Sequence, residues 1–299
     1  MTNHINSNGG PQNSVVIGVV LTAALIGASL VGWHYWRWLV RVKAVTLNNL
    51  AMTAYAKGDY TTALPLYEQS LAIHRKIGDK QGQGVMLNNI SQIYDAKGDY
   101  TTAMKYLEQS LRITQERGDK EGEGVTLNNI SQIYKARGDY PTALKYLEQS
   151  LRIRQEIGDK AGEGATLSNI GALYDAKGDY ATALKYLEQS LRIRQEIGDK
   201  AGEGTTLNNI GQIYAAKDDY TTALKYLEQS LAIVQETGNR AEEAVMSWNI
   251  GLTYKERGDL RKAEPYMSRT VQLDEEIGHP DLEQDRAALA ALRAQLKAR

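Results

Sequence analysis

Two kinds of amphipathic segment alternate along most of this chain, and most of these segments end at a Gly-Asp pair. Residues 161–178 are representative, because Leu167, Ile170 and Tyr174 recur at the spacing of one buried helix face. The next segment, residues 181–198, has the same kind of apolar stripe. Each Gly-Asp pair interrupts the periodicity and favours a turn. The pattern therefore predicts antiparallel helix pairs joined by short turns.

The pattern recurs at a fixed period of 40 residues. The stretch "ALKYLEQSLRIRQEIGDKAGEG" occurs at 143–164 and again, unchanged, at 183–204. A period of this length is typical of stacked supersecondary units, none of which can bury its apolar face alone. Six units begin near residues 44, 84, 124, 164, 204 and 244. The sequence thus predicts an all-α solenoid of six helix pairs over residues 44–279.

The order of small and apolar residues in each unit resembles the tetratricopeptide repeat (TPR) signature. The residues that carry the resemblance in the fourth unit are Leu167, Gly171, Tyr174, Ala183 and Leu187. The long period and the "LNNL" start are similar to the long-helix variety in kinesin light chains and spindle-orientation adaptor proteins. The resemblance implies that the first helix of each pair lines an inner surface that binds peptides. The family has a proline late in the second helix of each pair. This chain has glutamine at that position, so the second helix should continue beyond it; the residues are Gln115, Gln155, Gln195 and Gln235.

The two ends of the array carry different signals. After His279-Pro280, residues 280–299 place leucines on one stripe with charges elsewhere, which predicts a capping helix. At the other end, no charged residue lies between Val15 and Trp33, a run of roughly 28 Å as a helix, close to the hydrocarbon thickness of a bilayer. No Gly or Pro separates Trp33 from Lys57, so this helix should continue into the first repeat.

The flanks of the apolar run suggest how it is oriented. Aromatic and basic residues follow it, whereas residues 1–14 contain no Lys or Arg. Residues 1–14 are predicted to form a disordered tail. The positive-inside rule then places the array in the cytoplasm. We expect residues 15–40 to form one transmembrane helix of a single-pass membrane protein. A cleaved signal peptide, which would leave an extracytoplasmic array, is the alternative.

A row of amides recurs on the first helices. With Leu127 at the centre of the buried face, Asn129 lies about 200° and Gln132 about 140° around the helix, away from the core. Primary amides both donate and accept hydrogen bonds, so a row of them suits the backbone of an extended peptide. The predicted peptide-binding residues are Asn49, Asn89, Asn129, Asn169, Asn209, Asn249, Gln92, Gln132 and Gln212. Bridging between neighbouring first helices, or simple duplication of the repeat, would also explain the asparagines.

Composition narrows the function further. The net charge is −1, which argues against a nucleic-acid-binding face. There is no cysteine, and the four histidines are scattered, so neither a metal site nor a catalytic constellation is visible. The "GQG" and "GEG" triplets lack the context of a phosphate loop and should instead permit close helix packing. We expect a non-enzymatic, cofactor-free, membrane-anchored scaffold that binds proteins or peptides. The alternative hypothesis is a homo-oligomeric membrane assembly factor.

Overall fold

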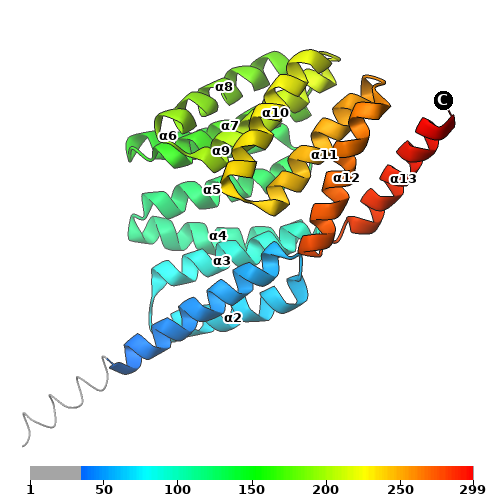
Figure 1. Ribbon diagram of the computed structural model, residues 1–299. Coiled ribbons are helices and arrows are strands. Elements are labelled where there is room, and N and C mark those ends of the chain that lie inside the picture. Colours follow the sequence, from blue (N-terminus) through cyan, green and yellow to red (C-terminus); the bar gives the residue numbers. More distant parts are fainter. Residues whose placement is uncertain (1–34, 299) are drawn as a thin grey trace, which may run out of the picture.

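The computed structural model describes residues 35–298, and every regular element in this part of the chain is an α-helix (Figure 1). The first helical stretch in this part of the chain covers residues 35–56. The others are α2 (Tyr60–Lys76), α3 (Lys80–Ala96), α4 (Tyr100–Arg117), α5 (Lys120–Ala136), α6 (Tyr140–Glu156), α7 (Lys160–Ala176), α8 (Tyr180–Glu196), α9 (Lys200–Ala216), α10 (Tyr220–Thr237), α11 (Arg240–Glu256), α12 (Leu260–Ile277) and α13 (Leu282–Ala298). The six predicted helix pairs are confirmed.

The helices fall into two sets with different neighbours. The A helices are the helix over 35–56 with α3, α5, α7, α9 and α11, and the B helices are α2, α4, α6, α8, α10 and α12. Each B helix from α2 to α10 packs between the A helix of its own pair and that of the next pair, and α12 packs between α11 and α13. Consecutive A helices from α3 onward also contact each other, whereas the B helices make no comparable contacts among themselves. The A helices therefore lie on the inner side of the stack.

The Gly-Asp turns end one helix and begin the next. Gly138 adopts a positive φ of 76°, a conformation that costs glycine little. Asp139 then caps α6, because its side chain accepts a hydrogen bond from the backbone N–H of Thr142 at 3.2 Å. The fifth unit is the exception, since Asp218 stands where the other units have glycine and has a φ of 60°.

The core is a series of small clusters rather than one thick interior. Ala143 and Leu147 of α6 meet Ile170 and Leu173 of α7, and all four side chains are buried. Equivalent clusters occur one repeat earlier and one repeat later. Because each cluster is closed by residues of two successive units, no unit buries its apolar face by itself.

Hydrogen bonds tie the A and B helices together at fixed positions. Ser150 of α6 donates its hydroxyl to the backbone carbonyl of Gly124 at 2.9 Å, and the other five pairs contain the same bond. The glutamine that replaces the family's proline lets α6 continue to Glu156, as predicted. Gln155 donates to the buried carboxylate of Glu163 in the next A helix at 3.0 Å.

The glycine triplets permit close helix packing, as predicted. A Cβ atom at Gly162 would lie 2.6 Å from Cδ of Arg154, and one at Gly122 would lie 2.8 Å from Cγ2 of Thr114. Both distances are too short for non-bonded carbon atoms. Side chains from the preceding B helix therefore occupy the space that a larger residue would need.

At the C-terminal end, α13 packs on α12 and contributes Leu289 and Leu292 to the last apolar cluster. Asp285 of α13 lies in the same joint. Burial, together with the neighbouring carboxylate of Asp274, raises the pKa of Asp285 to about 6, with a smaller contribution from Asp281 and an opposing one from His279. The capping helix thus carries a carboxyl group whose ionised form is disfavoured by burial and by a neighbouring negative charge.

At the N-terminal end, residues 35–56 form one uninterrupted helix, in agreement with the absence of Gly and Pro. The predicted tail over residues 1–14 and most of the predicted span over residues 15–40 lie outside the described residues. Among the helices of residues 35–298, none combines the length and the apolar character that crossing a bilayer requires.

Candidate functional site on the inner surface

The predicted asparagines lie where neighbouring A helices meet. Asn129 of α5 donates its side-chain N–H to Oδ1 of Asn88 on α3 at 3.1 Å. The same bond, always to the first asparagine of the preceding unit, is made by Asn89 to Asn48 at 3.1 Å, by Asn169 to Asn128 at 2.8 Å and by Asn249 to Asn208 at 2.8 Å. We call this series the amide ladder. The geometry therefore gives these four asparagines the bridging role that the sequence left open beside peptide binding.

The remaining predicted amides are outside the amide ladder. Asn49 is exposed in the first unit, and Asn209 has no hydrogen bond within the described residues because Ser168 replaces its partner. Gln92 and Gln132 are half-buried and Gln212 is exposed, and none of the three makes a hydrogen bond in this part of the chain. These amides are free to donate to, and accept from, a bound molecule.

Valine and charged residues share this face, and the sequence analysis had passed over most of them. Val85 and Val125 lie one turn before the asparagines Asn89 and Asn129 and remain 48% and 37% exposed. The spacing of four residues between each valine and its asparagine could have shown from the sequence that they share one face of the helix. The inner surface therefore combines exposed apolar side chains with amides.

A row of alternating charge runs beside the amides. Burial raises the pKa of Asp95 and of Asp175, with Lys135 opposing the shift at Asp175. Burial lowers the pKa of Lys135, and the carboxylate of Asp175 opposes that shift. Asp95, Lys135 and Asp175 therefore place both signs of charge along the inner surface. Its mixed charge does not favour a strongly acidic or strongly basic ligand.

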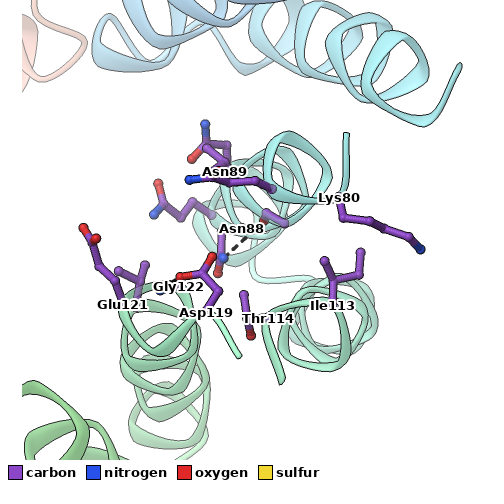
Figure 2. Close-up of a pocket in the computed structure, with 13 residues that line it drawn as sticks. Lys80, Asn88, Asn89, Ile113, Thr114, Asp119, Glu121 and Gly122 are labelled. Atoms are coloured by element: carbon purple, nitrogen blue, oxygen red, sulfur yellow. Dashed lines mark hydrogen bonds between the residues drawn. The ribbon is translucent and has the colours of Figure 1, made fainter. Parts of the chain in front are cut away.

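One pocket of about 210 Å³ opens on this surface between α3, α4 and α5 (Figure 2). Asn89 and Gln92, two of the predicted residues, line it together with Val85 and Val125. Thr114 of α4 forms part of its inner wall. The pocket lies at the joint between the second and third units.

The fold and its repeated residues match a known family. The model of the family described as "Tetratricopeptide repeat" matches residues 43–116, 122–196 and 202–276. The chain belongs to the tetratricopeptide repeat family. This result confirms the resemblance stated from the sequence. A comparison of this TPR protein with curated proteins finds no significant match.

Solved structures show the same fold. The Rap protein complexed with Competence and Sporulation Factor is 14% identical, with 86% of this chain and 76% of Rap covered and a TM-score of 0.64. NprR in complex with its cognate peptide NprX is 18% identical, with 95% and 82% covered and a TM-score of 0.62. A putative kinesin light chain with nearly identical TPR-like repeats, from Podosopora anserina, is 22% identical, with 66% and 97% covered and a TM-score of 0.50. At these identities the likeness is one of fold.

Proposed function

We propose that this TPR protein is a scaffold that binds peptide segments of partner proteins along the inner surface of its A helices. The observation that carries the proposal is the set of inner-surface glutamines, Gln92, Gln132 and Gln212, which have no hydrogen-bond partner within residues 35–298. Rap and NprR, which share the fold, have both been solved with a peptide factor bound. That likeness supports a peptide as the ligand class.

The chemistry of the surface suits an extended chain of mixed character. An extended peptide exposes backbone N–H and C=O groups alternately, and each amide side chain can pair with either. Val85 and Val125 provide apolar contacts, while Asp95 and Lys135 offer opposite charges along the same surface. A nearly neutral or mixed-charge segment should therefore bind better than a uniformly charged one.

The proposal includes attachment to a membrane through residues 15–40, with the array on the cytoplasmic side. Its support is the uncharged run in the sequence and the basic residues that follow it. Cell fractionation followed by protease treatment of intact cells tests this part. We expect residues 41–299 to be protected, and digestion from outside the cell would contradict the orientation.

The peptide-binding part is tested with substitutions that leave the amide ladder intact. Changing Gln92, Gln132 and Gln212 together to Ala removes free amides from the inner surface. The matched control changes three glutamines of the B helices, Gln109, Gln149 and Gln189, to Ala. Partner proteins recovered with the full-length chain should be lost in the first variant and kept in the control. Equal recovery by both variants would exclude the inner surface as the binding face.

A further inference from the structure

Each of the first five joints between successive units contains a buried or half-buried side chain whose identity varies along the array. In the third unit it is Arg154 of α6, which is only 7% exposed and whose Nη1 donates to Oδ2 of Asp159. In the fourth unit Arg194 of α8 pairs in the same way with Asp199. Both aspartates are the N-caps of the next A helix. The chain therefore twice places a guanidinium group against a capping carboxylate.

The other joints have related solutions. In the first unit, Nδ1 of His74 lies 3.0 Å from Oδ2 of Asp79, so an imidazole takes the place of the guanidinium. In the fifth unit the buried residue is the apolar Val234, and the N-cap is Asn239, which carries no charge. In three of these four joints the side chain is basic, and the N-cap of the next A helix is an aspartate. In the fourth joint the side chain is apolar, and the N-cap is an uncharged asparagine.

The second unit breaks this correspondence. Its joint residue is Thr114, which is too short to reach the capping carboxylate, yet the cap is still Asp119. Oδ1 of Asp119 accepts a hydrogen bond from the backbone N–H of Gly122 at 2.9 Å. Oδ2 has neither a hydrogen-bond partner nor an ion-pair partner among the described residues. One carboxylate oxygen is therefore left without the cation that its counterparts have.

The space that an arginine would fill is open at this joint. A Cβ atom added at Gly124 would lie 2.8 Å from Nε of Arg154, whereas one at the equivalent Gly84 would have Ser110 Oγ as its nearest neighbour at 3.6 Å. The pocket of about 210 Å³ occupies this region, and Asp119 lines it. In Figure 2 Asp119 and Thr114 lie side by side below Asn88, while the amino group of Lys80 extends away from them.

We propose that this pocket receives the guanidinium group of an arginine in the bound peptide, which pairs with Asp119 as Arg154 pairs with Asp159. The inference rests on the proposed function and names the side chain that anchors the peptide. Asn89 and Gln92 line the same pocket and have amide oxygens to which no described residue donates. A guanidinium offers five N–H donors in a planar fork, so it can reach the carboxylate and an amide oxygen together. Val85 and Val125 contact the aliphatic part of the arginine at the pocket mouth.

The test uses Thr114→Arg, a substitution that places at this joint the residue found at the corresponding position of the third and fourth units. Thr114→Arg fills the pocket with an internal guanidinium, and Arg154 and Arg194 occupy the same position beside the same glycine pattern and capping aspartate. Asp119→Asn removes the charge but keeps a capping residue, as Asn239 does for α11. Arg154→Thr in the Thr114→Arg background opens the joint one unit further along, where Val125, Asn129 and Gln132 correspond to Val85, Asn89 and Gln92. Circular dichroism and the thermal midpoint check that each variant is folded.

The probes are two random peptide libraries with one fixed central residue, either arginine or citrulline, which has nearly the same shape without the charge. On the immobilised full-length protein, we expect about tenfold or greater retention of the arginine library over the citrulline library. Thr114→Arg and Asp119→Asn should abolish this preference, and the added Arg154→Thr should restore it. Equal retention of both libraries by the wild type, still sensitive to the three inner-surface glutamines, would overturn the inference and leave the proposed function standing. Retention of neither library would overturn both.

Discussion

Repair of the interrupted amide ladder is the most direct test of how the repeats are held together. In the second unit, Asn88 is buried and accepts a hydrogen bond from Asn129 of the next A helix at 3.1 Å. In the fourth unit the same position holds Ser168, and Asn209 of the next A helix has no hydrogen bond among the described residues. We predict that Ser168→Asn restores the missing bond and stabilises the array.

The expected gain follows from the contacts that the new side chain can make. The amino group of Asn88 donates to Ser110 Oγ at 2.8 Å and to Thr126 Oγ1 at 2.9 Å. Ser168 already bonds the equivalent hydroxyl of Ser190 at 2.8 Å, so the substitution adds one net bond, to Asn209. A net intramolecular hydrogen bond contributes about 1 kcal/mol to stability. Ordering a longer side chain offsets part of this, which leaves a gain of roughly 0.5–1 kcal/mol.

Amide hydrogen exchange measures the effect where it arises. Protection of α7 and α9 should increase up to about fivefold in Ser168→Asn, because 1 kcal/mol corresponds to about that factor. The reciprocal variant, Asn88→Ser, removes the equivalent bond and should lower the protection of α3 and α5 by a similar factor. Unchanged exchange in both variants would show that the amide ladder does not stabilise the stack, and it would return the asparagines to the peptide-binding hypothesis alone.

Three further predictions concern the turns, the core and the cap. Asp218→Gly should raise the unfolding free energy by about 1 kcal/mol, because glycine adopts a φ of 60° without the penalty of a Cβ atom, and a lower thermal midpoint would contradict this. Leu187→Ala should lower the unfolding free energy by about 3–5 kcal/mol in urea titrations, because this leucine is 0% exposed and the loss leaves a cavity, whereas a loss below about 1 kcal/mol would mean that the joint collapses around it. The pKa of Asp285 is raised to about 6, so the folded protein binds its proton more tightly than the unfolded chain. Stability should therefore fall by roughly 1–2 kcal/mol as the pH rises from about 4 through about 6, less than the full shift would give because solvent screens this partly exposed joint. Asp285→Asn should remove this part of the pH dependence, which thermal midpoints of both proteins at about pH 5 and about pH 7.5 measure, and a parallel dependence in the two proteins would contradict the assignment.

The sequence alone determined the fold of the repeats. A 40-residue period with helical spacing of apolar residues predicts a stack of helix pairs, because every internal unit has the same neighbours and buries its apolar face against them in the same way. The glycine and aspartate at most turns and the glutamine late in four of the B helices are local signals, and the structure confirms the elements they predicted. The predicted span over residues 15–40 has the same kind of sequence support and stays a prediction.

Only the tertiary structure decided how the inner-surface residues are used. Asn129 and Asn88 are 41 residues apart, and their hydrogen bond depends on the separation and rotation of two A helices, which no local pattern specifies. Thr114 is one ordinary helix residue in the sequence, and the pocket beside Asp119 becomes visible only when Arg154 is seen to fill the matching space in the next unit. Periodicity fixes what the repeats share, whereas a cavity arises where one side chain fails to reach across a joint between helices, and that reach is a property of three-dimensional packing.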